Sequence, residues 1–319
     1  MKKSDTLITI FGGSGFLGRE VVRTLAERRY RLCIAVRHPH LAGHLRPPGR
    51  FEEIHAVRAN VCSPRSVTAA VRDAEIVINL VGILVEDGAQ QFDAVHAEGA
   101  RIVARAAAQV GAQLIHVSAI GADARSPARY AQSKARGEAA VLAEVPGATI
   151  FRPSIMFGPH DDFFNRFAAM ARILPFLPLI GGGDTRFQPV FVGDVANAIA
   201  KAVGGQTRPG TIYELGGPDV RTFKELMEFV LSTIGGNGCL CRSRSRSPNS
   251  RPPSCSSSPD RPSHPSKSSC SSAIMSSPAK PSRRAEHLLR SISILLRSKP
   301  SSRRISATRH GSNVSQPIA

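Results

Sequence analysis

Short apolar runs alternate with longer amphipathic segments along the first part of the chain. The runs are rich in β-branched residues and are bounded by polar residues or glycine, which is typical of buried strands. The segments between them carry apolar residues at helical spacing, and we expect helices there. The predicted strands are Leu7–Phe11, Arg31–Val36, Glu53–Val57, Ile76–Val81, Gln113–Val117 and Ala148–Phe151, and the predicted helices are Phe16–Arg28, Pro64–Ala70, Ala94–Val110 and Tyr130–Leu142.

This alternation predicts an α/β fold. Short buried strands that alternate with helices form a parallel sheet covered on both faces. Because such crossovers are right-handed, the sheet is expected to be a doubly wound Rossmann sheet. We divide the chain into a nucleotide-binding Rossmann core at residues 1–155, the remainder of the core with a small C-terminal subdomain at 156–235, and a tail at 236–319.

The composition changes abruptly near residue 238. The formal charge of the chain is +18, yet residues 239–319 alone carry 15 Lys and Arg against 2 acids, together with 25 serines and no aromatic residue. Such a segment buries too little apolar surface to offset chain entropy. We therefore predict disorder from about residue 239, with at most a weak helix around Glu286–Arg297. Out-of-frame reading of a GC-rich gene explains this composition and leaves the subdomain incomplete; a natural Ser/Arg-rich tail is the alternative.

The sequence gives no support for a metal site, a disulfide framework, a membrane-spanning helix or a presequence. Cys33 and Cys62 belong to no C-x-x-C pair, so we predict neither a metal site nor a disulfide framework. No apolar run reaches the roughly 18 residues that a membrane-spanning helix needs. The first strand begins by about Thr6, which leaves no room for a presequence, and we expect a cytoplasmic protein.

A glycine pattern directly after the first strand predicts a phosphate-binding loop. Gly12 permits a tight turn, Gly15 lets the backbone approach a pyrophosphate, and Gly18 lets the following helix pack closely. The free N–H groups and the positive dipole end of that helix then face the phosphates. The loop residues expected to bind the cofactor are Gly12, Ser14, Gly15, Phe16, Leu17 and Gly18.

The second strand ends without the acid that selects NAD. Arg37 stands at that place, and a guanidinium binds a 2′-phosphate well, so we predict a preference for NADP(H), with NAD(H) as the alternative. Asn60 and Val61 follow the third strand and are expected near the adenine. Val81 and Gly82 follow the fourth strand and are expected at the second ribose.

Further motifs follow in order along residues 6–234: FGGSGFLGREVV, NLVGIL, VHAEGARIVARAA, HVSAIGA, YAQSKARGE, FRPSIMFGP and QPVFVGDVA. In this combination the chain resembles the atypical short-chain dehydrogenase/reductases. It is most similar to the group containing the NADPH-binding accessory subunit of respiratory complex I and its bacterial relatives. The resemblance implies a protein that holds NADPH for structural or assembly purposes, with a respiratory complex or its assembly factors as partners. It also implies a location that is cytoplasmic or peripheral at the inner face of a bioenergetic membrane.

The resemblance also implies a catalytic pair that is incompletely supported. Tyr130 and Lys134 match the Y-x-x-x-K motif, and a lysine cation beside the tyrosine favours the phenolate. Ser118, just after the fifth strand, falls before the position of the usual catalytic serine, which lies closest to Ile120, and His96 replaces a common asparagine. Lys134 then holds the nicotinamide ribose, and Ser118, Pro153 and Ile155 lie near the nicotinamide.

Two further hypotheses stay open at this point. One is an NADP-dependent oxidoreductase or epimerase/dehydratase-like enzyme that acts on a small or quinone-like substrate, because the resemblance links some relatives to ubiquinone biosynthesis. The other is a nucleic-acid binder that uses the basic run at Arg242–Pro248. That run has no aromatic residue for base stacking. We therefore expect no specific nucleic-acid partner.

Overall fold

A seven-stranded, fully parallel sheet forms the centre of the protein. The computed structural model describes residues 5–45, 54–174, 176–235 and 239–242. The strand order is β11-β6-β5-β4-β1-β2-β3. Successive strands are added on one side of β1 up to β3 and on its other side from β4 onward, as in a doubly wound Rossmann fold. The strands are β1 (Leu7–Phe11), β2 (Arg31–Val36), β3 (Ile54–Arg58), β4 (Ile76–Asn79), β5 (Gln113–Val117), β6 (Thr149–Pro153) and β11 (Ile212–Leu215).

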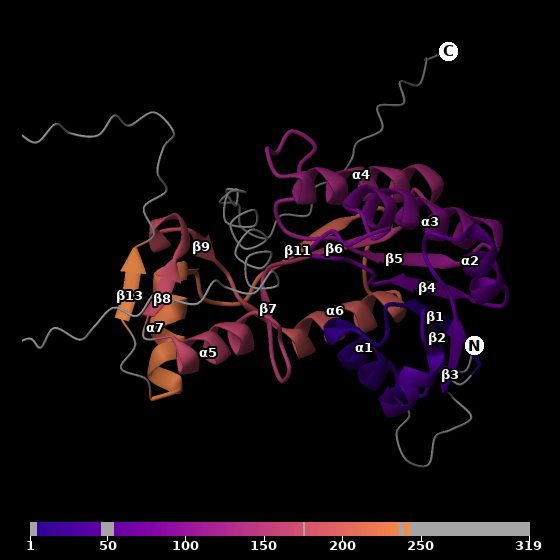
Figure 1. Cartoon of the computed structure of the whole chain (residues 1–319). Helices are drawn as coiled ribbons and strands as arrows, with labels where there is room; N and C mark the ends of the chain where they lie inside the picture. The colour runs from indigo at the N-terminus through magenta and orange to yellow at the C-terminus, as the bar shows by residue number, and fades with distance from the viewer. Residues whose placement is uncertain (1–4, 46–53, 175, 236–238, 243–319) are drawn as a thin grey trace, which may run out of the picture.

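Helices cover both faces of this sheet (Figure 1). One face carries α2 (Pro64–Val71), α3 (Gly99–Gln109) and α4 (Arg129–Glu144). The other face carries α1 (Phe16–Glu27) and α6 (Val192–Val203). The predicted α/β fold with a Rossmann sheet is confirmed. The six predicted strands all form, and β11 completes the sheet from a segment for which no strand was predicted.

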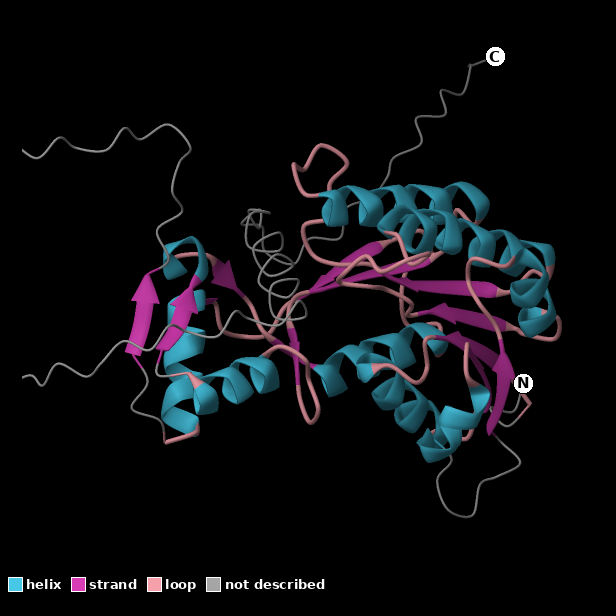
Figure 2. Cartoon of the chain, viewed as in Figure 1, coloured by secondary structure: helices cyan, strands magenta, loops and turns pink. Residues whose placement is uncertain are grey.

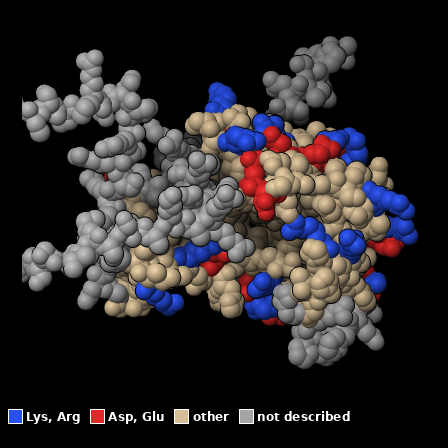
Figure 3. Space-filling view, viewed as in Figure 1, with Lys and Arg blue, Asp and Glu red and all other residues tan. Residues whose placement is uncertain are grey.

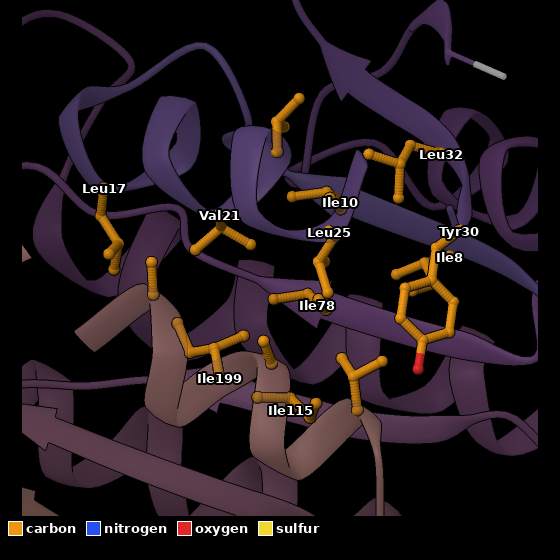
Figure 4. Packing of buried hydrophobic residues seen from close by; sticks show 14 of the residues in the cluster. Ile8, Ile10, Leu17, Val21, Leu25, Tyr30, Leu32, Ile78, Ile115 and Ile199 are labelled. Carbon is orange, nitrogen blue, oxygen red and sulfur yellow. The ribbon is translucent and has the colours of Figure 1, made fainter. Parts of the chain in front are cut away.

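The face under α1 is closed by an apolar stripe at helical spacing. Leu17, Val21 and Leu25 lie one turn apart on α1 and are buried. Figure 4 shows them turned toward Ile199 of α6 and toward the strands of the sheet. Full burial of each such side chain contributes about 1.5–3 kcal/mol. The stripe therefore fixes where α1 begins, and with it the position of the glycine loop.

The helix predicted at residues 94–110 is two elements. A π-helix spans Asp93–Glu98 and passes directly into α3. A Cβ atom on Gly137 would lie 2.1 Å from the carbonyl oxygen of His96, so α4 can approach this segment only with glycine there. The wider π turn is a local feature that apolar periodicity does not reveal, and such turns are frequent at functional sites.

A smaller region lies at one end of the sheet (Figures 1 and 2). It contains α5 (Phe164–Ile173), β8 (Phe176–Leu179), β9 (Arg186–Phe187), β12 (Arg221–Thr222) and α7 (Phe223–Thr233). The short strands β7 (Met156–Phe157) and β10 (Val190–Phe191) pair with each other in parallel. Edge-to-face contacts between phenylalanine rings fill the centre of this region, and the rings belong to Phe163, Phe167, Phe187 and Phe223.

One expectation about the tail is wrong. We predicted disorder from about residue 239, but Cys239–Arg242 form a strand, β13, that pairs in parallel with β8. The open edge of β8 offers backbone hydrogen-bonding groups to almost any sequence, and Leu240 also packs against the phenylalanine cluster. The rest of the tail lies outside the described residues. This includes residues 243–248 of the basic run and the predicted weak helix at Glu286–Arg297. The division at residues 155 and 235 stays a prediction.

Replacement of Ile199 tests the packing of α6 on α1. Ile199 is 0 % exposed, whereas Ile173 at the end of α5 is 82 % exposed. Ile199→Ala should lower the free energy of unfolding by about 2–4 kcal/mol, because it leaves a cavity between the two helices. Ile173→Ala, the same change at the surface, should stay within about 0.5 kcal/mol. Urea denaturation measures both, and equal losses would contradict the packing described here.

Candidate nucleotide-binding and active site

The glycine loop is a tight turn that holds the start of α1 against the end of β1. Gly12 has a φ angle of +81°, and the N–H of Gly15 donates to its carbonyl oxygen at 3.1 Å. A Cβ atom on Gly18 would lie 2.2 Å from that same oxygen, so only glycine permits this approach. No side chain caps the first turn of α1. The geometry suits an anion at this helix N-terminus.

The loop is also pressed against its neighbours in the sheet. A Cβ atom on Gly13 would lie 2.8 Å from a methyl group of Ile34 on β2, a requirement that the sequence analysis missed. A Cβ atom on Gly12 would lie 3.2 Å from the backbone nitrogen of Val81, beyond the end of β4. The carbonyl oxygen of Ser14 accepts a hydrogen bond from Arg19 Nε at 3.2 Å. The loop is thus fixed from both sides.

The predicted adenine end lies beyond the carboxyl ends of β2 and β3. Arg37 is exposed, directly after β2. Asn60 Oδ1 accepts the backbone N–H of Cys62 at 3.0 Å and closes a short turn, while Val61 is buried. Burial raises the pKa of the Cys62 thiol, and the charge of Arg37 acts against this rise. Arg37 therefore lies close enough to the Asn60–Cys62 turn to act on it.

The segment after β4 brings the glycine loop and α4 together. Asn79 Oδ1 accepts the N–H of Val81 at 3.1 Å, which ends the strand two residues earlier than predicted. A Cβ atom on Gly82 would lie 3.1 Å from Lys134 Nζ and 3.7 Å from His96 Nε2. Gly82 leaves this side of Lys134 open for a ligand. The predicted ribose residues thus adjoin the predicted catalytic helix.

Tyr130 and Lys134 lie one turn apart on α4, with Lys134 Nζ 6.0 Å from the centre of the Tyr130 ring. Burial lowers the pKa of Lys134 to about 8, against the opposing charge of Glu138. Burial also raises the pKa of Tyr130 to about 12. The pKa of Tyr130 thus moves away from the expected phenolate, because burial disfavours the charged form of the side chain. A neutral phenol can donate a proton but is a poor base.

The histidine in the π-helix is held at both ring nitrogens. His96 Nε2 accepts the N–H of Ile83 at 2.9 Å, and Nδ1 lies 2.9 Å from Ser133 Oγ. The Ser133 hydroxyl in turn donates to the carbonyl oxygen of Tyr130 at 2.8 Å. Burial, with the nearby charge of Lys134, lowers the pKa of His96 to about 2. The imidazole is neutral.

Two polar side chains on β5 and just after it are buried without a partner. Neither ring nitrogen of His116 nor the Ser118 hydroxyl has a hydrogen-bond partner among the residues that the structure describes. Burial, with the charge of Lys134, lowers the pKa of His116 to about 3. A buried polar group without a partner costs about 1–3 kcal/mol. The Ser118 hydroxyl therefore suits a ligand or water at this end of the sheet.

The predicted nicotinamide end is formed mainly by backbone. The N–H of Ile120, the residue expected nearest the usual serine, donates to the carbonyl oxygen of Pro153 at 3.1 Å. The carbonyl oxygen of Ile155 accepts the N–H of Val190 at 2.9 Å. The first contact ties the segment after β5 to the end of β6, and the second ties the segment after β6 to β10. Neither contact involves a side-chain hydroxyl.

Sequence reasoning missed an ion triad one turn beyond Lys134. Arg152 on β6 binds Glu138 through two hydrogen bonds of 2.8 and 2.6 Å and reaches Glu214 on β11 at 3.3 Å. The Glu138 carboxylate raises the pKa of Arg152. Glu138 continues the four-residue spacing of Tyr130 and Lys134, which was the available signal. Its partners come from distant strands and could not be read from that spacing.

The comparisons with known proteins place the chain in a family. Residues 6–277 match the model of the RmlD substrate binding domain. The chain therefore belongs to this family of atypical, NAD(P)-binding short-chain dehydrogenase/reductases, which includes epimerases and dehydratases. The fold agrees with dTDP-glucose 4,6-dehydratase from Bacillus anthracis, with a TM-score of 0.63 and 17% identity over 75% of this chain and 85% of that one.

Two relatives of this chain carry names that describe different functions. The mitochondrial NADH dehydrogenase (ubiquinone) 1 alpha subcomplex subunit 9 of Arabidopsis thaliana is 37% identical over 235 residues, which cover 72% of this chain and 58% of that protein. Ceramide reductase of Caulobacter vibrioides is 33% identical over 241 residues, 74% of this chain and 73% of that protein. The match thus spans less than two thirds of the respiratory subunit's own length.

The described part of the chain carries neither a membrane-spanning helix nor a cluster of metal-ligating side chains. No helix there is long and apolar enough to cross a membrane. No group of three or more His, Cys, Asp or Glu side chains there could hold a metal ion. Figure 3 shows basic and acidic side chains interspersed on the face in view.

The buried ammonium of Lys134 makes stability depend on pH. Its pKa falls from 10.5 to about 8 in the folded protein, so the unfolded chain binds this proton more strongly between those values. Stability should therefore rise with pH across this window. Lys134→Met should be the more stable protein at pH 7, and its advantage should shrink by about 2–3 kcal/mol as the pH rises to 10.5.

Urea denaturation at a series of pH values measures this difference. Lys201→Met, at an exposed position in the last turn of α6, is the matched control and should show no such window. A Lys134→Met advantage that is the same at every pH would mean that the ammonium is not destabilised by burial.

Proposed function

We propose that this chain is a NAD(P)H-binding protein of the complex I accessory-subunit type, which holds NADPH for structural or assembly purposes with little or no turnover. The observation that carries the proposal is the contrast within the site. The glycine loop has the close backbone approaches of a phosphate cradle, whereas Ile120 supplies no hydroxyl to the proton-transfer set. Such a site favours holding a dinucleotide over transforming a substrate.

In this proposal the chain's own residues divide the cofactor among them. The Gly12–Gly18 loop receives the pyrophosphate, Arg37 the 2′-phosphate, and the Asn60–Val61 turn the adenine. Val81 and Gly82 adjoin the second ribose, whose hydroxyl groups are in reach of Lys134, so the ammonium gains acceptors and its burial costs less. Ser118, Pro153 and Ile155 lie at the nicotinamide, which supplies a hydride when the reduced cofactor is bound.

The partner and the location rest on the relatives. The Arabidopsis relative is named as a subunit of a mitochondrial NADH dehydrogenase, and its identity of 37% supports a place in or beside a respiratory complex. We accordingly propose a peripheral position at the inner face of a bioenergetic membrane. The matched part covers 58% of that relative. Co-migration with complex I on native gels, described below, tests whether this chain joins such a complex.

A second function is favoured by one relative and by the protonation state of the site. Ceramide reductase is matched over 73% of its length, a larger share than the respiratory subunit. A neutral Tyr130 phenol can donate a proton to a carbonyl oxygen while a hydride reaches the carbonyl carbon. The alternative is therefore an NADP-dependent reductase of an apolar carbonyl compound, a quinone-pathway substrate included.

The test begins with protein purified without added nucleotide. The released cofactor is identified by mass spectrometry, and the NADPH-loaded protein is then offered long-chain ketones and quinones while NADPH absorbance is followed. The accessory-subunit proposal expects bound NADPH, no oxidation by any compound, and co-migration with complex I on native gels. Oxidation by one compound that disappears in Tyr130→Phe would establish the reductase instead.

Arg37→Ala tests the predicted cofactor preference. Loss of a charge-assisted hydrogen bond to the 2′-phosphate costs about 1.5–3 kcal/mol, so NADPH should bind roughly ten- to a hundredfold more weakly and NADH almost unchanged. Arg172→Ala, at an exposed position in the last turn of α5, should bind both cofactors as the parent does. Calorimetric titration of the parent and both variants with each cofactor measures the six affinities, and equal binding of NADPH and NADH by the parent would overturn the assignment.

A further inference from the structure

Three segments meet at the side chain of His96. The loop after β4 reaches it through the N–H of Ile83, which donates to Nε2 at 2.9 Å. Helix α4 reaches it through Ser133, whose Oγ lies 2.9 Å from Nδ1. The π-helix carries the histidine itself. One imidazole therefore joins the segment predicted to line the cofactor with the helix that carries Tyr130.

The hydrogen bonds leave a single arrangement of protons. Nε2 faces an N–H donor and must be unprotonated, so the ring proton lies on Nδ1. Nδ1–H then donates to Ser133 Oγ, and the Ser133 hydroxyl donates to the carbonyl oxygen of Tyr130 at 2.8 Å. Each donor in this series of hydrogen bonds has one acceptor. A second ring proton would set two donors against each other at Ile83.

The imidazole ring of His96 also contacts the aromatic ring of Tyr130. The Tyr130 ring stands edge-on to His96 with ring centres 5.4 Å apart, and Phe92 stacks on His96 at 5.5 Å. Phe92 and Tyr130 are also in edge contact at 5.7 Å. Close approach at Gly137 fixes α4 against the backbone carbonyl of His96. Side chain and backbone of this residue thus both locate the phenol.

We propose that His96 is a positioning residue that couples cofactor binding at Gly82–Ile83 to the placement of Tyr130 on α4. A ligand that settles against Gly82 fixes the Ile83 N–H and, through His96 and Ser133, the first turn of α4. Coupling of this kind is reciprocal, so a disturbed tie also weakens binding of the cofactor. The coupling to cofactor binding rests on the proposed function. The hydrogen-bonded link from Ile83 through His96 and Ser133 to α4, called the tie below, does not depend on it.

The residue type explains why this position holds histidine in this chain. Asparagine also offers one donor and one acceptor but has no ring to contact Tyr130. His96→Asn therefore separates the two roles. It should keep part of the hydrogen-bond tie while it loses the stacking with Phe92 and Tyr130.

The first experiment needs no cofactor. Nitrogen NMR of the intact chain should show His96 protonated at Nδ1 only and unchanged between about pH 5 and 9. Ser133→Ala removes a single hydroxyl and should shift both the His96 ring signals and the Ile83 amide signal. Val103→Ala, a buried truncation on α3, controls for general loss of stability and should shift neither. A His96 ring that titrates near its ordinary pKa, or an Ile83 amide that ignores Ser133→Ala, would overturn the tie.

The second experiment measures NADPH affinity. His96→Ala should weaken binding about tenfold and Ser133→Ala about threefold, and the double variant should be no weaker than His96→Ala alone, because one chain of contacts is cut in each. Added imidazole should restore part of the affinity of His96→Gly. Additive losses, or parent-like affinity in His96→Ala, would overturn the coupling. A parent that binds no NADPH would instead refute the proposed function and leave the NMR result to judge the tie.

Discussion

The buried ammonium of Lys134 is the constraint on which the rest of the site depends. It is 5 % exposed, and among the described residues no carboxylate bonds to it, because Glu138 is engaged by Arg152. Its charge helps to hold His96 and His116 neutral, and both imidazoles have pKa values far below the ordinary range. The surrounding groups are therefore neutral or already paired. A ligand with hydroxyl acceptors beside Lys134 would lower the cost of burying this charge, which is the part that the proposed function gives to a ribose.

Part of this arrangement could be predicted because it is local. Gly12, Gly15 and Gly18 lie within one turn and one helix start, and Tyr130 and Lys134 lie one helical turn apart, so their proximity follows from secondary structure alone. The partners of Glu138 come from β6 and β11, and those of His96 come from α4 and the loop after β4. These contacts depend on how the elements pack. Periodicity carries no information about them.

The tail also shows a structural feature that the sequence pattern could not predict. Composition correctly marks where the apolar pattern ends, yet Cys239–Arg242 form a strand all the same. A strand added at the edge of β8 is held mainly by backbone groups, which every residue except proline supplies in full. Side-chain composition therefore predicts where a core cannot form. It does not predict where backbone pairing stops.

Binding and turnover place different demands on this fold, and the chain meets them unequally. The phosphate cradle is made of backbone, so it needs only glycine where a Cβ atom would collide, as at Gly18. Turnover also needs a phenol whose pKa suits proton transfer and a hydroxyl to hold the substrate oxygen. The proposed role without turnover rests on this difference, because Ile120 would supply no such hydroxyl while the backbone cradle stays intact. In this proposal a member of an enzyme family keeps its cofactor as a structural element, because the backbone groups that hold the pyrophosphate are separate from the side chains that would move a proton.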